Sequence, residues 1–355
     1  MPSLAGHSAQ RYVSPSRMNL SEIASRFILP GPVVSHEEVT TGLINTTYVV
    51  SCRSGSTETR FILQSINSAV FPEPEKVMEN IFHVTLHIGS RDPGTEQLCL
   101  IPIHEGRSWL RLPNNTIWRC YPFHEGTETF EKITSPDLAF RAAAAYGHFQ
   151  SRLSDLDPST LHETLPNFHH TPTYFAKLFA AVKSDPEERL AEVQADLDFI
   201  LSKKCLTTAL TGAGLPTRIT HNDTKISNIL FPTNPALPPI VIDLDTVMPG
   251  LALFDFGDMV RSAASSAAED EADLEKVFID KDMRKALTEG YLSTAAEFLT
   301  PEETALLPVS AEVLTFELAT RFLTDHLLGD KYFRTKYPGH NLVRARNQLA
   351  LLKSM

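Results

Sequence analysis

The sequence predicts an α+β fold with two lobes, a small β-rich one followed by a larger helical one. With 355 residues, the chain is long enough for two domains of ordinary size. Short β-branched runs dominate as far as residue 122, and long segments with helical periodicity dominate after it. We therefore expect a disordered Ser/Pro-rich segment (1–18), a first domain (19–122) and a second domain (123–355).

The first domain is expected to contain a β-hairpin, one helix and two further strands. Residues 46–50 (TTYVV) and 60–67 (RFILQSIN) are strand-like, and a turn-like segment joins them. Residues 108–112 (SWLRL) and 116–123 (TIWRCYPF) are strand-like as well. The stretch 71–89 begins with prolines and ends at a glycine, as a helix often does. Its apolar residues repeat at helical spacing and predict one buried face: Val77, Ile81, Val84 and Ile88.

The second domain is expected to be helical, with a β-rich insert. The insert covers residues 217–244, where two apolar β-like runs flank a Pro-rich turn. The clearest helical patterns are LAFRAAAAYGHFQSRL, PTYFAKLFAAVKS, EERLAEVQADLDFILSKK and VLTFELATRFLTDHLL.

Charge and cysteine spacing narrow the class of protein. The chain carries 32 Lys and Arg against 43 Asp and Glu, a formal net charge of −11. Such a chain repels nucleic acid and anionic membranes, so we expect neither as a partner. The 4 cysteines lie far apart without zinc-like spacing, as is typical of free thiols in a reducing compartment. No signal peptide or long apolar run is visible, so we expect a cytoplasmic location; the sequence indicates no particular oligomeric state.

The strongest chemical signal is a set of three polar residues in the β-rich insert. Asp223 is followed five positions later by Asn228, and Asp243 comes twenty positions after Asp223. Asn228 and Asp243 offer the oxygen ligands that Mg²⁺ prefers, and ATP phosphates would complete its coordination. Asp223 is then free to accept a proton from an attacking hydroxyl. This division of labour is that of the catalytic loop of kinases, so the sequence predicts a two-lobed protein-kinase-like fold.

Neighbouring residues fit the same hypothesis. Lys225 is placed to neutralise charge on the transferring phosphoryl group. His221 is interpreted as a structural residue that bonds the loop backbone, although a metal ligand is an alternative. Because Asp and Asn are common in turns, each residue alone would be weak support; the complete set between apolar strands is specific.

A second kinase-like string, Asp255-Phe256-Gly257, lies downstream. It is too far from Asp223 and opens a helical segment, so we assign metal binding to Asp243. Asp255 is expected to tie that helix to the catalytic loop. Asp245 is left open between a second metal contact and a surface carboxylate.

The chain resembles the aminoglycoside phosphotransferase and choline kinase superfamily, and within it the N-acetylhexosamine 1-kinases. The strings that carry the resemblance span most of the chain: GLINTTYVV, FILQSIN, THNDTKISNILF, VIDLDTVMPGLALFDFGD, RFLTDHLLGDKYF and KYPGHNLVRARNQ. The resemblance implies ATP as co-substrate, Mg²⁺ as cofactor, and transfer of the γ-phosphoryl group to the anomeric hydroxyl of GlcNAc or GalNAc. It also points to a nucleotide site in the first domain, at Gly42, Asn45, Thr46, Gln64, Tyr121 and Phe123.

The chain departs from related patterns at two positions. Gln64 stands where protein kinases carry a lysine for the α- and β-phosphates, so Mg²⁺ must supply more of the positive charge. The usual Lys–Glu pair is therefore absent, and Glu75 and Glu79 have no obvious partner. The family loop GHIN has Leu43 in place of histidine here, which removes one nucleotide contact.

The acceptor site is expected on the last long helix. Glu317, Arg321 and Asp325 recur every four residues and share one helix face. An exposed salt-bridge ladder is the alternative reading of this spacing. The resemblance points instead to Arg321 and Tyr332 as sugar contacts, and we add Asp325 and the base Asp223 to the substrate-binding set.

Two other functions compete with a sugar kinase. A kinase for choline or a similar amino alcohol would need an aromatic cage, and the sequence shows no aromatic cluster near the acceptor helix. A catalytically silent kinase-fold binding protein is favoured by Gln64 and Leu43 but opposed by the complete catalytic set.

Overall fold

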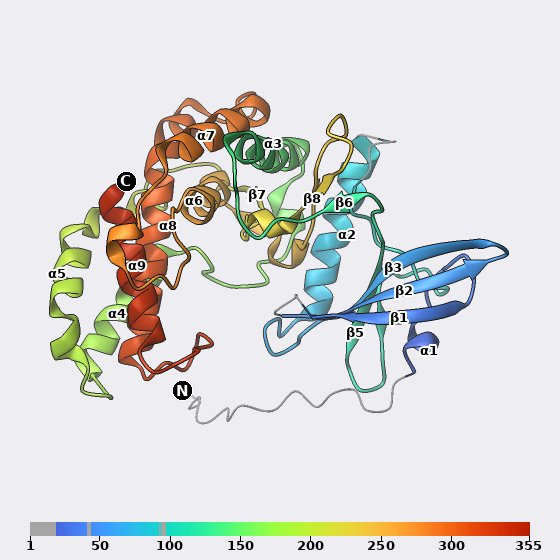
Figure 1. Cartoon of the computed structure of the whole chain (residues 1–355), viewed down its shortest axis with the longest axis horizontal. Helices are drawn as coiled ribbons and strands as arrows, with labels where there is room; N and C mark the ends of the chain where they lie inside the picture. Colours follow the sequence, from blue (N-terminus) through green and yellow to red (C-terminus); the bar gives the residue numbers. More distant parts are fainter. Residues whose placement is uncertain (1–18, 41–43, 92, 94–96) are drawn as a thin grey trace. The chain divides into compact units, whose positions relative to one another are not determined.

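The computed structural model describes residues 19–40, 44–91, 93 and 97–355, and it divides into two compact units (Figure 1). The first unit comprises the described residues of Met1–Pro74 and Cys99–Phe123, and the second comprises those of Glu75–Leu98 and His124–Met355. The first unit is built on a sheet and the second is largely helical, which confirms the predicted α+β class.

The first unit contains an antiparallel sheet of strand order β1-β2-β3-β5-β4, whose longer strands lie side by side in Figure 1. Helix α1 (Leu20–Ala24) precedes the sheet. The strands are β1 (Val33–Val39), β2 (Thr46–Ser54), β3 (Thr57–Ser65), β4 (Leu110–Arg111) and β5 (Ile117–Pro122).

The predicted hairpin is confirmed by the pairing of β2 with β3. Its register runs from Thr46 opposite Ser65 to Ser54 opposite Thr57. The turn between the strands contains Gly55 at φ 61°, a left-handed conformation that glycine adopts without steric cost.

The second unit holds the remaining elements. Its helices are α2 (Pro74–Arg91, whose first residue belongs to the first unit), α3 (Pro136–Arg152), α4 (Thr171–Ser184), α5 (Gln194–Ser202), α6 (Ala252–Ala263), α7 (Lys281–Ala295), α8 (Pro301–Leu327) and α9 (His340–Ser354). Its short strands are β6 (Thr127–Glu128), β7 (Arg218–Thr220), β8 (Ile229–Pro232), β9 (Ile240–Val241) and β10 (Met248–Gly250). Single 3₁₀ turns lie at Pro158–Thr160, Leu190–Val193, Lys204–Thr208, Ile226–Asn228, Leu244–Thr246 and Leu274–Lys276.

Helix α2 forms where its sequence predicts it, and its four periodic apolar residues are all buried. The sequence places this stretch in the first domain, whereas residues 75–98 group with the second unit in the structure. Asn80 on α2 accounts for part of this grouping, because its amide nitrogen donates to the carbonyls of His162 (2.8 Å) and Val247 (2.9 Å). The functional division into domains 19–122 and 123–355 stays a prediction.

The helix expected over residues 187–204 is broken in the structure. A 3₁₀ turn (Leu190–Val193) precedes the shorter helix α5. By contrast, the last long helix begins earlier than its clearest pattern, because Thr300 and Glu303 form a capping box at its N-terminus.

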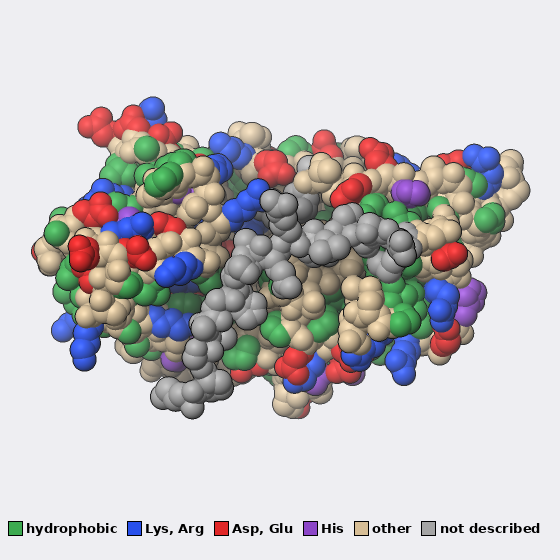
Figure 2. All heavy atoms as spheres, turned by 90° about the horizontal axis from the view of Figure 1, so that it is seen from below, with side chains coloured by type: hydrophobic (Ala, Val, Ile, Leu, Met, Phe, Trp, Pro, Cys, Tyr) green, Lys and Arg blue, Asp and Glu red, His purple; other side chains and the backbone are tan. Residues whose placement is uncertain are grey.

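None of the described helices is long and apolar enough to cross a membrane. On the face shown in Figure 2, acidic and basic side chains are interspersed over the described surface.

The buried face of α2 gives a test of the fold. Replacing Ile81, whose side chain is fully buried, by alanine should lower the free energy of unfolding by about 2–5 kcal/mol, because a cavity is left behind. Leu86→Ala on the same helix is the matched control; its side chain is 59% exposed, and the expected change is within about 0.5 kcal/mol. Urea titration of both variants measures the difference, and equal losses would contradict this packing.

Candidate active site

The catalytic loop follows β7 and leads through a 3₁₀ turn into β8. β8 pairs antiparallel with β9, with Ile229 opposite Val241. One residue outward, the Ile242 N–H donates to the Asn228 carbonyl at 3.0 Å. This register brings Asn228 next to Ile242, the residue that precedes Asp243, although Asn228 and Asp243 are fifteen positions apart in the sequence.

Asp223 is held by two neighbours. Its Oδ1 lies 2.7 Å from the Lys225 Nζ, and its Oδ2 accepts from the Asn228 Nδ2 at 3.1 Å. Lys225 is half-exposed; partial desolvation favours its neutral form, but the Asp223 carboxylate outweighs this effect and raises the pKa of Lys225. The lysine therefore stays positively charged beside the carboxylate.

The orientation of the Asn228 amide fits an oxygen ligand for Mg²⁺. Its nitrogen donates both to the side chain and to the main-chain carbonyl of Asp223 (2.9 Å), which leaves Oδ1 as the atom directed elsewhere. Asp243 is exposed and has φ 59°, an uncommon backbone conformation for a residue with a side chain. One carboxylate and one amide oxygen match the small protein contribution that Mg²⁺ needs when phosphates supply the rest. Within the described ranges, no cluster of three or more His, Cys, Asp or Glu offers an alternative metal site.

Asp255 on α6 ties that helix to the catalytic loop, as predicted. Its buried carboxylate accepts from the backbone N–H groups of His221 (2.9 Å) and Asn222 (2.7 Å), and from the Gln150 amide (2.6 Å). Its own carbonyl accepts from the Thr224 hydroxyl. The loop backbone is thus fixed on both sides of Asp223.

His221 has the structural role that we expected. Its Nε2 lies 2.9 Å from the Ile242 carbonyl, and its Nδ1 lies 3.3 Å from the Asp223 backbone nitrogen. The imidazole therefore connects the catalytic loop to the strand end that carries Asp243.

Packing explains the kinase-like string Asp255-Phe256-Gly257. A Cβ on Gly257 would lie 2.6 Å from the Ser310 carbonyl, so only glycine lets α6 approach α8 this closely. The Phe256 ring is buried against Tyr291. Asp245 is buried as well, which excludes the surface-carboxylate alternative for it.

Helix α8 presents a buried polar row rather than an exposed ladder, so the ladder alternative is wrong. The Glu317 side chain is 2% exposed and that of Arg321 is 13% exposed, with their closest charged atoms 3.9 Å apart. Burying charged side chains is costly unless they are paired. These residues therefore do not serve simply to keep the surface of the helix in contact with water.

Three aromatic rings surround the Arg321 guanidinium. Its Cζ lies 4.7 Å from the ring centre of Tyr174, 5.5 Å from Phe333 and 5.8 Å from Phe168. The expectation that aromatic residues do not cluster near the acceptor helix is therefore wrong. The cluster is assembled from α4, from the segment before it and from the turn after α8, so spacing along the chain does not reveal it.

Asp325 organises the turn that follows α8. Its carboxylate accepts from the backbone N–H groups of Lys331 (3.0 Å), Tyr332 (2.8 Å) and Phe333 (2.9 Å). It also accepts from the Asn341 amide at 2.9 Å. Four donors occupy this buried carboxylate, so Asp325 positions the turn that carries Tyr332 and Phe333. Tyr332 itself is 74% exposed.

In the first unit, Gln64 is held by two side chains. The Arg119 Nε donates to its Oε1 at 3.0 Å, and its Nε2 donates to the Thr47 hydroxyl at 3.0 Å. Arg119 lies opposite Gln64 in the β3–β5 register and is buried. A positive charge thus stands beside the glutamine that replaces the kinase lysine.

Glu79 has a partner that the sequence did not reveal. The His162 Nε2 lies 2.6 Å from its carboxylate, within the second unit.

The other predicted nucleotide residues belong to the same unit as Gln64. The side-chain oxygen (Oδ1) of Asn45 accepts a hydrogen bond from the Asn67 backbone N–H at 3.0 Å, and Thr46 begins β2. Tyr121 is buried in β5, and the Phe123 N–H donates to the Arg60 carbonyl at 3.1 Å. Gly42, like Leu43, lies outside the described residues.

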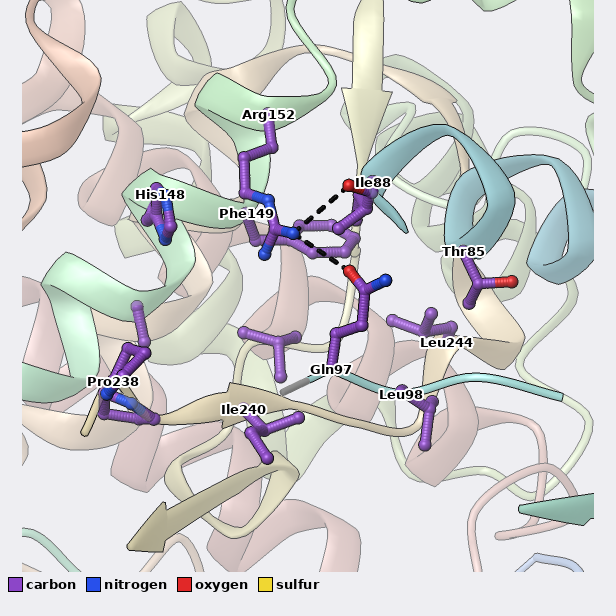
Figure 3. A pocket seen from close by; sticks show the side chains of 13 residues that line it. Thr85, Ile88, Gln97, Leu98, His148, Phe149, Arg152, Pro238, Ile240 and Leu244 are labelled. Atoms are coloured by element: carbon purple, nitrogen blue, oxygen red, sulfur yellow. Dashed lines mark hydrogen bonds between the residues drawn. The ribbon is translucent and has the colours of Figure 1, made fainter. Parts of the chain in front are cut away.

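A pocket lies beside the β8–β9 hairpin (Figure 3). It is lined by side chains of α2, α3 and the 238–244 segment, and Arg152 reaches across it to the Ile88 carbonyl (3.3 Å) and to Gln97 (2.9 Å). Phe149 forms part of its wall and also packs edge-on against His221. This wall therefore supports the catalytic loop from behind.

Asp255→Ala tests the anchoring of the loop. Three buried donors would lose their acceptor, and each costs about 1–3 kcal/mol, so the free energy of unfolding should fall by at least about 3 kcal/mol. Asp243→Asn is the matched control, because Asp243 is exposed and asparagine tolerates its left-handed backbone conformation; its unfolding free energy should stay within about 1 kcal/mol. Chemical denaturation of both variants measures this; a larger loss for Asp243→Asn would reverse the assignment of the two carboxylates.

Known proteins share this architecture. The aminopropanol kinase associated with a microcompartment superposes with a TM-score of 0.61 at 16% identity, covering 94% of this chain and 95% of that one. An aminoglycoside phosphotransferase from Alicyclobacillus acidocaldarius gives 0.62 at 12% identity, with 96% of each chain covered. A spectinomycin phosphotransferase in complex with ADP and spectinomycin gives 0.56 at 12% identity, covering 95% and 98%.

At these identities the structural likeness shows the fold alone. The sequence itself goes further, since residues 35–287 match the pattern of the APH phosphotransferase enzyme family. That match covers well over half of the 355 residues and includes the Asp223, Asn228 and Asp243 set. The chain therefore belongs to the APH phosphotransferase enzyme family.

Proposed function

We propose that this protein transfers the γ-phosphoryl group of ATP to the anomeric hydroxyl of an N-acetylhexosamine. The observation that supports phosphoryl transfer is the contact between Asp223 and Asn228. It places the proposed base and a proposed metal ligand side by side in one loop. Family membership supports a phosphotransferase reaction, and the choice of a sugar as acceptor rests on the surroundings of Arg321.

Asp223 acts as the base. Its carboxylate accepts the proton of the acceptor hydroxyl as the oxygen of that hydroxyl attacks the γ-phosphorus and the bond to ADP breaks. An anomeric hydroxyl is more acidic than an ordinary alcohol, so a carboxylate can serve as its base. Lys225 is half-exposed, so its flexible side chain can turn from Asp223 toward the phosphoryl oxygens.

Asn228 and Asp243 would hold Mg²⁺ through the Asn228 Oδ1 and the Asp243 carboxylate. When bound, the ion neutralises charge on the phosphates. Gln64, Asn45, Thr46 and the Tyr121–Phe123 backbone would contact the nucleotide. The Phe123 N–H already donates to Arg60, so any adenine contact in this conformation falls to other main-chain groups.

Arg321 is the proposed contact to the sugar. Its guanidinium can donate to hydroxyls or to an N-acetyl carbonyl, and Tyr332 can stack on the sugar or hydrogen-bond with it. The three rings around Arg321 enclose a cation that belongs to the protein. A quaternary ammonium group at the same place would be repelled, so the cluster favours a neutral acceptor.

An amino alcohol is the second candidate acceptor. The structural likeness to an aminopropanol kinase favours it. The two candidates differ in charge, and this difference makes them separable by experiment.

Coupled ADP-release assays with GlcNAc, GalNAc, choline, aminopropanol and an aminoglycoside decide between them. We expect the highest kcat/KM for an N-acetylhexosamine. Preference for choline or aminopropanol would establish the amino alcohol, and turnover of none of these acceptors, with ATP binding intact, would support a silent binding protein.

Asp223→Asn should keep the fold and ATP binding and lose phosphoryl transfer. General base catalysis contributes roughly 10²–10⁴-fold, so kcat should fall by about that factor. Single-turnover rates and nucleotide titration measure the two properties separately. A variant with kcat near that of the wild type would show that Asp223 is not the base.

Arg321→Ala should lower kcat/KM for the sugar by roughly 10- to 150-fold, because a hydrogen bond from a charged donor contributes about 1.5–3 kcal/mol. The KM for ATP should stay unchanged. Lys331→Ala is the control: this exposed lysine adjoins Tyr332, and its nearest carboxylate is 3.9 Å away, on Glu187. An equal effect of Arg321→Ala on ATP and sugar would place the acceptor elsewhere.

A further inference from the structure

His169 lies between the catalytic loop and the acceptor helix. It is buried just before α4, outside every motif identified in the sequence. Its Nε2 lies 3.3 Å from the carbonyl oxygen of Asn222, the residue before the proposed base. Its Nδ1 lies 3.1 Å from the Glu317 Oε1 on α8. One imidazole therefore contacts both halves of the proposed site.

Both ring nitrogens of His169 face acceptors. A carbonyl oxygen can only accept a hydrogen bond, and so can an ionised carboxylate. A neutral imidazole has a single N–H and can satisfy one of the two contacts, whereas the imidazolium satisfies both. The geometry thus calls for a positively charged His169 whenever Glu317 is ionised.

Glu317 is shared between His169 and the acceptor side. Its Oε2 accepts from the Thr171 hydroxyl at 2.8 Å, and its Oε1 lies 3.1 Å from His169 and 3.9 Å from Arg321. If His169 lost its proton, Arg321 would be the remaining cation beside this carboxylate. Arg321 would then be drawn toward Glu317 and away from a substrate.

We infer that His169 is a positioning residue, which in its charged form holds the loop of Asp223 and keeps Glu317 from capturing Arg321. This inference rests on the proposed function, because it presumes that Asp223 and Arg321 both serve the acceptor. Through His169, protonation couples acceptor binding to the geometry of the base.

The electrostatic surroundings of His169 agree with this role. Burial favours the neutral imidazole, but the hydrogen bond and charge of Glu317, together with Asp258 on α6, outweigh it and raise the pKa of His169; Arg321 opposes the rise. The Phe168 and Phe254 rings pack beside the imidazole, and the Asn222 carbonyl faces its Nε2. The folded pKa lies above the ordinary value of about 6.5. The stabilisation is therefore complete below about pH 6.5 and is lost as pH rises through the raised pKa.

The test combines a titration with kinetics. The imidazole signals of the full-length protein are followed by NMR without substrate, and the His169 signal is identified by sequential assignment. We expect it to titrate above about pH 6.5 and to shift downward in Glu317→Gln, which keeps the shape and removes the charge. Titration of His169 at or below that value, or no change in Glu317→Gln, would overturn the inference.

The kinetic arm measures KM for the acceptor against pH. In the wild type, KM should rise by roughly tenfold through the pKa of His169, as a charge-assisted contact is lost. His169→Gln should abolish that rise, and His170→Gln is the matched control, because the exposed His170 contacts Thr173. If the rise persists in His169→Gln, the inference is wrong. If His169→Gln does not fold, Glu317→Gln takes its place, with the rise in KM expected to disappear, because no carboxylate is left to draw Arg321 away from the acceptor; a rise that persists would overturn the inference.

The two proposals fail in different ways. If no acceptor is phosphorylated, the proposed function fails, while the NMR titration still decides whether His169 carries its charge. If an acceptor is phosphorylated but the pH dependence of KM is the same in all variants, only the role of His169 fails.

Discussion

The buried carboxylate of Asp255 is the constraint on which the rest of the site depends. It accepts the N–H groups of two successive residues, His221 and Asn222, in a loop whose Asn222 has φ 65°. A non-glycine residue in that conformation persists only where its surroundings hold it. The fixed loop backbone, together with the hydrogen bond from the Asn228 amide to the Asp223 carbonyl, positions the Asp223 carboxylate to meet Lys225 and Asn228.

Around this anchor, rigid groups are buried and reactive groups are accessible. Asp255, His169 and Glu317 are buried, whereas Lys225 and Asp243 are exposed. Such a separation suits phosphoryl transfer, in which positioning comes from a fixed frame and the proposed reactive groups must be accessible to substrate. At the proposed acceptor site, Asp325 acts as Asp255 does in the loop, since its carboxylate fixes the turn that carries Tyr332.

Much of this could be predicted from the sequence, because the relevant signals are local. Alternating β-branched residues predicted the β2–β3 hairpin, helical periodicity predicted the buried face of α2, and the polar set between two apolar runs predicted the catalytic loop. The second kinase-like string, Asp255-Phe256-Gly257, was correctly interpreted as structural. Asp255 anchors the loop, and Gly257 lets α6 pack closely against α8.

The remaining features depend on contacts between distant segments. His169 meets Glu317 across 148 positions, and Arg119 meets Gln64 across 55, so no spacing along the chain indicates either pair. The aromatic residues around Arg321 were missed for the same reason. The i, i+4 pattern on α8 suggested an exposed ladder because periodicity reports which residues share a face and not whether that face is covered.

The position of the new phosphate on the product tests the central claim most directly. After reaction with N-acetylhexosamine and Mg-ATP, ³¹P–¹H NMR should show the phosphorus coupled to the anomeric proton. The 1-O-methyl glycoside of the same sugar, whose anomeric oxygen is blocked, should not react. A phosphate on any other carbon, or turnover of the methyl glycoside, would contradict the account.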